Sequence, residues 1–132
     1  MRTILITVAM LMFCKYSISQ NKIHMLKIKS VPLELATPYK VNCDFFETAF
    51  DGQFNEKNIR VNADIILMCS LIENVVYVKS DNFIDTRVKI YVTFEKSTKK
   101  TIICLSSNHL ISVNGKLIKE NKKLVDLIKK IM

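Results

Sequence analysis

Cys104 and His109 are the two side chains whose types and spacing come closest to catalytic machinery. A thiolate is a strong nucleophile and a nearby imidazole can accept its proton, which would make the chain a small thiol-dependent hydrolase. The alternative is that Cys104 is a core or bridged cysteine and that His109 belongs to a polar turn starting at Ser106. We favour the alternative, because a strand and the turn after it do not fix the geometry that proton transfer requires. We therefore expect a protein that is not an enzyme.

Neither a metal nor a cofactor is expected from the residue types present. The two histidines, His24 and His109, are far apart in the sequence, and two glycines are too few for a phosphate-binding loop.

Three cysteines, Cys43, Cys69 and Cys104, follow the N-terminal segment and allow three different single disulfides. Cys69 lies in an apolar helical pattern and has the character of a small core residue. By elimination we favour a Cys43–Cys104 disulfide, and the absence of any bridge is the alternative. No two cysteines have the C-x-x-C spacing of a redox pair or a zinc knuckle.

Arg87, Lys89 and Tyr91 alternate with apolar residues and therefore share one face of a predicted strand. If that face of the sheet is uncovered, the row is exposed and offers an aromatic anchor beside two cations to an acidic protein or an anionic envelope surface. An ordinary solvated strand face has the same composition, so both interpretations stay open. The aromatic interleaving of nucleic-acid-binding sheets is missing, and no nucleic-acid partner is expected.

The charge of the chain is unbalanced, with 20 Lys and Arg against 12 Asp and Glu and a formal net charge of +8. Such an excess favours anionic partners, although it also simply keeps a small protein soluble. The first hypothesis is a non-enzymatic exported binding or interaction module of the cell envelope. The second is a peripheral binder of anionic lipid or glycan surfaces.

Residues 1–19 have the organisation of a cleavable signal peptide. Arg2 supplies a positive start, Ile4–Phe13 is an uncharged apolar run, and Ser17 and Ser19 are the small residues that a signal peptidase needs before a cut at Gln20. The run is too short to span a bilayer, and no later run reaches the roughly 18 residues that a transmembrane helix needs. We expect export to the periplasm or beyond, and one domain over residues 20–132.

Local patterns predict the elements of that domain. Asparagines at positions 42, 62 and 121 are suited to cap three helices, over Cys43–Phe50, Ala63–Val76 and Lys122–Ile131. Alternating or continuous apolar residues predict strands over Ile23–Val31, Arg87–Glu95, Thr101–Ser106, Leu110–Val113 and Lys116–Ile118. Asn114-Gly115 predicts a tight hairpin between the last two strands, because both residues tolerate a positive φ. The pattern over Phe54–Val61 is ambiguous.

The order of these elements predicts an α+β fold. We expect an antiparallel sheet of three to five strands with two or three helices packed on one face.

Four short stretches together resemble small exported proteins of Bacteroidota-type bacteria, a group to which no activity is assigned. They are the helix start Asn42–Phe46, the strand opening Ile84–Ile90, the Ile103-Cys104 strand and the hairpin Asn114–Lys116 before a terminal helix. The resemblance implies a bacterial envelope address and carries no mechanism.

Overall fold

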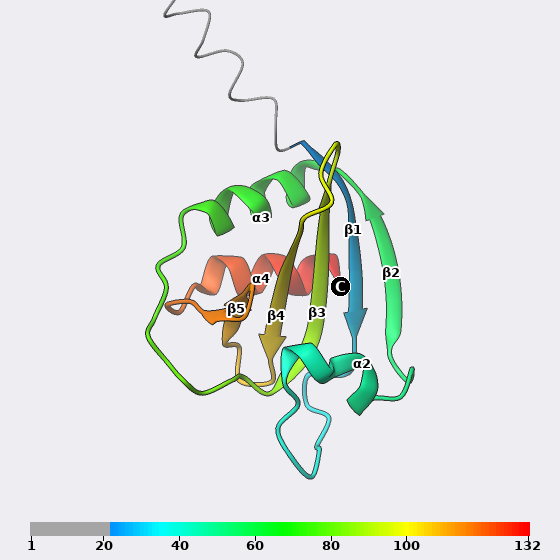
Figure 1. Ribbon diagram of the computed structural model, residues 1–132, viewed down its shortest axis with the longest axis vertical. Helices are drawn as coiled ribbons and strands as arrows, with labels where there is room; N and C mark the ends of the chain where they lie inside the picture. Colours follow the sequence, from blue (N-terminus) through cyan, green and yellow to red (C-terminus); the bar gives the residue numbers. More distant parts are fainter. Residues whose placement is uncertain (1–21) are drawn as a thin grey trace, which may run out of the picture.

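Six antiparallel strands form the sheet that organises residues 22–132, the part of the chain that this computed structural model describes (Figure 1). In spatial order they are β2 (Asn55–Arg60), β1 (Ile23–Ser30), β3 (Thr86–Phe94), β4 (Lys100–Ser106), β5 (Ile111–Val113) and β6 (Lys116–Leu117). The α+β class and the antiparallel sheet are confirmed, whereas the expected strand count of three to five is wrong. The predicted signal segment and the cut between Ser19 and Gln20 lie outside the described residues.

Strand β2 is the element that the sequence pattern did not identify. It lies at one edge of the sheet, pairs with β1, and has five of its six residues exposed. Since Ile59 is the one residue of β2 that packs against the core, little alternation of apolar and polar residues is required of the strand, and the periodicity that marks a strand is missing.

One face of the sheet is apolar and is covered by two helices, α3 (Ala63–Glu73) and α4 (Lys122–Ile131). In Figure 1, α4 passes behind the central strands. The fully buried side chains that the sheet and the helices share include Leu26, Ile28, Val88, Ile90, Ile103, Ile65, Met68, Leu124 and Ile128. This layer is the main hydrophobic core of the described residues, and burial of its apolar surface is the dominant force that holds sheet and helices together.

The opposite face carries a short helical segment, which we had not expected on that side. It consists of η1 (Cys43–Phe45) and α2 (Phe46–Ala49), which lie in front of the sheet in Figure 1. A disulfide joins Cys43 to Cys104 on β4, so the favoured cysteine pair is confirmed. The prediction that the helices share one face of the sheet therefore holds for α3 and α4 and fails for η1 and α2.

The three asparagine caps form as predicted. The side-chain oxygens of Asn42, Asn62 and Asn121 accept backbone N–H hydrogen bonds at the starts of η1, α3 and α4, at 3.2, 3.0 and 3.1 Å. In the hairpin, Asn114 and Gly115 have φ angles of 50° and 80°, as a type I′ turn requires.

Helix α3 ends at Glu73, three residues before the predicted end at Val76. Val76 is 62% exposed, and its carbonyl accepts a hydrogen bond from the backbone N–H of Lys119 at 2.7 Å. The apolar spacing suggested a longer helix, but pairing with the chain beyond β6 draws these residues into an extended conformation instead.

No helix among residues 22–132 is long and apolar enough to cross a membrane.

We expect the Cys43–Cys104 disulfide to contribute strongly to stability, because it closes a loop with a sequence separation of 61 residues. Replacing both cysteines with alanine is expected to lower the free energy of unfolding by about 4 kcal/mol, as measured by urea denaturation. Dithiothreitol should destabilise the wild-type protein to a similar extent and leave the double variant unchanged. Equal stability of the oxidised and reduced wild-type proteins would contradict this prediction.

Candidate functional site

The row that we singled out, Arg87, Lys89 and Tyr91, lies on β3 and faces away from the hydrophobic core. Strand register places Lys29 of β1 and Cys104 of β4 on either side of Lys89. The next pair along the strand places Lys27 of β1 and Ile102 of β4 on either side of Tyr91 in the same way. The polar face thus gathers basic side chains from two neighbouring strands around one aromatic ring.

Arg87 belongs to the fold rather than to an accessible surface. Its side chain forms a two-point ion pair with Asp85, with N–O distances of 2.8 and 3.0 Å. The remaining N–H groups donate to the carbonyls of Leu35 and Thr86 and to the hydroxyl of Thr37, at 3.0, 3.0 and 3.1 Å. These contacts satisfy all five donors of a guanidinium. Arg87 is consequently 2% exposed and holds the segment around Leu35 and Thr37 against the sheet.

Lys89 is also buried, with 4% of its surface exposed, because α2 covers this part of the sheet. The condition of an uncovered face is therefore not met at Arg87 and Lys89, and Tyr91 alone of the three is half-buried. Binding of a partner by this row stays a prediction, and such contact has to involve Tyr91 and the residues around it.

Glu47 of α2 supplies the carboxylate that this buried charge requires. It accepts hydrogen bonds from Lys89 at 3.1 Å, from Lys29 at 3.4 Å and from the hydroxyl of Tyr91. The distances in sequence are 42, 18 and 44 residues, so local patterns carry no sign of these contacts. The signal that could have suggested them is the carboxylate of Glu47 in a short predicted helix, together with the basic strand residues Lys29 and Lys89.

The ionisation of this cluster follows from its contacts. Partial burial disfavours the charge on Glu47, but the hydrogen bonds from Tyr91, from its own backbone N–H and from Lys89 outweigh it and lower its pKa from 4.5 to about 2. Burial and the neighbouring Glu47 carboxylate raise the pKa of Tyr91. Burial opposes the charge on Lys89, but its hydrogen bonds to Tyr91 and Glu47 raise its pKa. At neutral pH the site therefore holds a carboxylate at Glu47, a neutral phenol at Tyr91 and a charged Lys89.

Positive charge remains in excess around Tyr91. The ammonium groups of Lys29, Lys89 and Lys100 lie 5.3, 5.2 and 5.9 Å from the centre of its ring. Glu47 pairs with Lys29 and Lys89, so one carboxylate balances two of the three cations near the ring. Lys100 is exposed and has no ion pair among the described residues. The arrangement can hold a further anionic group next to the ring.

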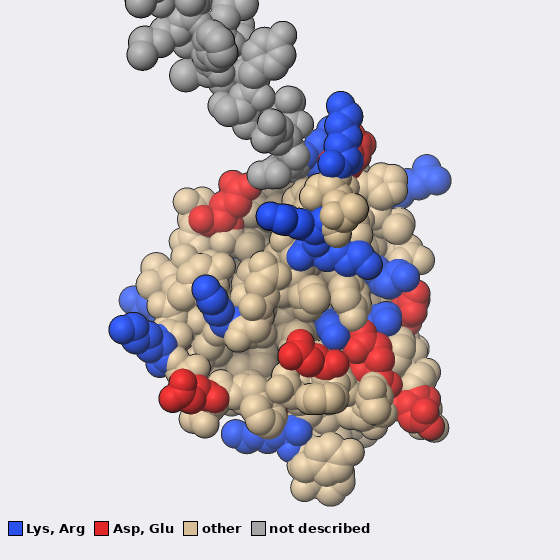
Figure 2. Space-filling view, in the orientation of Figure 1, with Lys and Arg blue, Asp and Glu red and all other residues tan. Residues whose placement is uncertain are grey.

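The part of the face beyond α2 is uncovered. Half-buried Tyr91, Ile102, Thr93 and Met25 form its middle, and exposed Lys100 lies beside them. Figure 2 shows this side of the molecule, with basic side chains gathered over the upper part of the surface, acidic ones below them, and a hollow in the middle. We call this surface, made by Met25, Lys27, Tyr91, Thr93, Lys100 and Ile102, the open face.

The disulfide removes the nucleophile of the hydrolase hypothesis. Cys104 is fully buried and bonded to Cys43, so it has no thiolate, and His109 is exposed in the following turn at a φ of 65°. Among residues 22–132 the free thiol is that of Cys69. Its burial and the nearby Glu73 raise its pKa to about 11. A thiol with such a pKa is a poor nucleophile at neutral pH.

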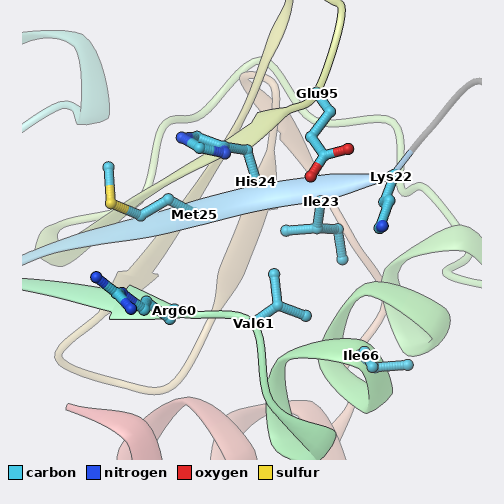
Figure 3. Close-up of a pocket in the computed structure, with 8 residues that line it drawn as sticks. All are labelled: Lys22, Ile23, His24, Met25, Arg60, Val61, Ile66 and Glu95. Atoms are coloured by element: carbon cyan, nitrogen blue, oxygen red, sulfur yellow. The ribbon is translucent and has the colours of Figure 1, made fainter.

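A cavity of about 630 Å³ lies at the start of β1, where the end of β2 and the start of α3 meet (Figure 3). Ile23, Val61 and Ile66 give it an apolar wall, and the lining also includes Lys22, His24, Met25, Arg60 and Glu95. Sequence reasoning missed it because its residues come from four separate stretches of chain. No side-chain hydrogen bond or ion pair joins its polar residues to one another within residues 22–132, so it does not form a catalytic constellation.

Within residues 22–132, no three His, Cys, Asp or Glu side chains are grouped so that they could hold a metal ion. The chain matches no protein-family model, no curated protein and no solved structure.

Because the pKa of Glu47 is lower in the folded protein, its stabilising effect is complete above the ordinary value of 4.5 and is lost as the pH falls through about 2. We expect Glu47→Gln to lower the free energy of unfolding by about 1 to 2 kcal/mol at neutral pH, after allowance for solvent screening. Urea denaturation at a series of pH values should show the two proteins converging as the pH falls from about 4.5 towards 2.

The matched control is Glu56→Gln, since Glu56 pairs with Lys27 at 3.5 Å but both side chains are about 40% exposed. This variant should change stability by less than about 0.5 kcal/mol at every pH. A difference between wild type and Glu47→Gln that does not depend on pH would refute the assigned ionisation.

Proposed function

We propose that this chain is an exported, non-enzymatic binding module of the cell envelope that contacts an acidic partner through the open face. The observation that carries the proposal is the charge imbalance around Tyr91, where three lysine ammonium groups lie near the ring and only two of them, Lys29 and Lys89, pair with the single carboxylate of Glu47. A partly buried excess of positive charge is destabilising by itself and is relieved when an anionic group binds beside it.

The open face also has the composition of a contact surface. Tyr91 presents an aromatic ring whose hydroxyl is held by Glu47, so little side-chain freedom is lost on binding. Ile102 and Met25 add half-buried apolar area beside it, and exposed Lys100 lies at the rim. An aromatic anchor with an apolar surround and a charged rim is the usual organisation of a binding interface.

Export is supported by the Cys43–Cys104 disulfide, because disulfides persist in oxidising compartments such as the periplasm and the extracellular space. The absence of a free thiol at Cys104 favours a binding role over the thiol-hydrolase alternative.

The second candidate function, peripheral binding to an anionic lipid or glycan surface, is favoured by α4. Its solvent side carries Lys122, Lys123, Lys129 and Lys130, all of them exposed. These lysines lie on the helix that covers the other face of the sheet, so the two candidate functions use different surfaces.

Charge reversal at the open face separates the two candidates. We expect Lys100→Glu to weaken binding to fluorescently labelled poly-L-glutamate about tenfold at low salt, because it replaces an attractive charge with a repulsive one. Lys122→Glu is the matched control and should weaken binding less than about twofold, since one distant surface charge contributes little.

The same variants are compared on vesicles of phosphatidylserine and phosphatidylcholine. Loss of poly-L-glutamate binding in Lys122→Glu but not in Lys100→Glu would overturn the proposal. Vesicle binding that depends on Lys122 would establish the lipid alternative in its place.

Export predicts a specific mass. When the full chain is expressed in a bacterium, the envelope fraction should yield a protein that begins at Gln20, as measured by intact-mass spectrometry. Before reduction one thiol should react with iodoacetamide under denaturing conditions, and after reduction three should react, because Cys43 and Cys104 are paired. An unprocessed chain that begins at Met1 with every thiol free would refute both the export and the disulfide.

A further inference from the structure

The segment Val76–Val78 extends the sheet beyond β6. Tyr77 forms an antiparallel bridge with Ile118. The backbone N–H of Val78 donates to the carbonyl of Leu117 at 2.9 Å, and that of Lys119 donates to the carbonyl of Val76 at 2.7 Å. In Figure 1 the chain that follows α3 runs along the outer side of the sheet, past β5. Val76–Val78 is therefore the outermost extended segment at this edge, and we call it the outer segment.

The pairing pattern leaves the backbone of Tyr77 directed away from the sheet. The two hydrogen bonds flank the Tyr77–Ile118 pair and involve the residues on either side, which identifies it as a non-hydrogen-bonded antiparallel pair. In such a pair the N–H and C=O of each residue point away from the partner strand. Among residues 22–132 no backbone carbonyl accepts a hydrogen bond from the Tyr77 N–H.

The side chains of the outer segment are apolar and exposed. Val76, Tyr77 and Val78 are 62%, 51% and 43% exposed. The opposite edge of the sheet, β2, has the sequence Asn-Glu-Lys-Asn-Ile-Arg, and charges on an edge strand discourage further pairing. An edge of β-branched and aromatic residues has no such protection and is a template for an added strand.

Two lysines and one aspartate lie beside the outer segment. A hollow of about 730 Å³ beside it is lined by Lys79 and Lys116 against the carboxylate of Asp81. The ammonium group of Lys116 lies 5.9 Å from the centre of the Tyr77 ring. Alternate side chains of a strand added at Tyr77 would point towards this hollow, where acidic groups would meet the two lysines.

We propose that the outer segment is a docking edge to which an extended, acidic segment of a partner protein adds as a further β-strand. Main-chain hydrogen bonds to Tyr77 hold the added strand, and its acidic side chains pair with Lys79 and Lys116. A second copy of this chain fits less well, because a symmetric joint would bring the same lysines together from both sides. The docking edge is separate from the open face and does not depend on the function proposed for it.

The probe is a fluorescein-labelled decapeptide that alternates glutamate and valine, with a lysine–valine peptide of the same length as its control. Fluorescence anisotropy is measured on the Lys100→Glu protein, which suppresses binding at the open face. We expect saturable binding of the acidic peptide and none of the basic one. By NMR, hydrogen exchange at the Tyr77 amide should slow at least about tenfold when the acidic peptide is added, because the N–H becomes hydrogen-bonded.

A matched pair of variants isolates the backbone contribution. Tyr77→Ala removes the ring, whereas Tyr77→Pro removes both the ring and the outward N–H. Neither change removes the hydrogen bond from Val78 N–H to Leu117 or the one from Lys119 N–H to Val76. Tyr77→Pro should bind the acidic peptide about 2- to 10-fold more weakly than Tyr77→Ala, the range expected for one backbone hydrogen bond. Thermal unfolding of both variants checks that the fold is kept.

Three results would overturn the proposal: no binding of the acidic peptide, equal binding of the basic peptide, or binding that leaves exchange at the Tyr77 amide unchanged. The exchange measurement uses no proline, so it decides the matter even if Tyr77→Pro fails to fold. A concentration-dependent dimer whose Tyr77 amide is protected without peptide would show that a second copy is the occupant.

Discussion

Burial of cationic side chains on one face of the sheet is the constraint on which the rest of this structure depends. Arg87 and Lys89 are almost fully buried, and a buried charge is costly unless carboxylates and hydrogen-bond acceptors surround it. Asp85, just before β3, supplies the carboxylate for Arg87, and the chain between β1 and β2 supplies Glu47 for Lys89 and the carbonyl of Leu35 for Arg87. The contacts of Arg87 with Leu35 and of Lys89 with Glu47 therefore hold the loop after β1 and the short helix α2 against the sheet.

The two faces of the sheet are covered by different physical means. On the apolar face, α3 and α4 are held by burial of hydrocarbon, which is non-directional. On the polar face, directional contacts add to a small apolar cluster: a disulfide at Cys43 and hydrogen bonds to Glu47 hold η1 and α2, and Phe46 of α2 is fully buried. Asp85 ties the chain that precedes η1 to β3, because it pairs with Arg87 and also accepts a hydrogen bond from the backbone N–H of Val41 at 2.8 Å. Directional contacts satisfy particular groups and leave the remainder of the face uncovered, and that remainder is the open face.

The same contrast distinguishes the edges of the sheet. Strand β2 is polar on both sides and pairs with β1, and it ends the sheet with charged side chains. The outer segment Val76–Val78 ends the sheet with exposed apolar side chains and the outward backbone of Tyr77. The two surfaces that we propose as contact sites, the open face and the outer segment, both place exposed lysines beside apolar area, and this chemistry is the reason for proposing acidic partners.

Much of the local structure could be predicted from the sequence. The caps at Asn42, Asn62 and Asn121 and the Asn114-Gly115 turn depend on a few neighbouring residues, and so does the alternation that marks β3. The Cys43–Cys104 pair followed from the apolar setting of Cys69. The caps, the turn and the alternation are short-range, so the order of residues contains what is needed to recognise them, whereas the disulfide has a sequence separation of 61 residues and was reached by elimination.

Tertiary structure alone decided the rest. It turned the unpatterned stretch around β2 into an edge strand, ended α3 at Glu73, buried Lys89 beneath α2, and brought Glu47 to lysines from two strands. In each case a contact between residues far apart in the sequence outweighs a weak local preference. Composition determined that the protein is basic, but only the packing of the chain decided which of its charges are neutralised inside the fold and which stay exposed.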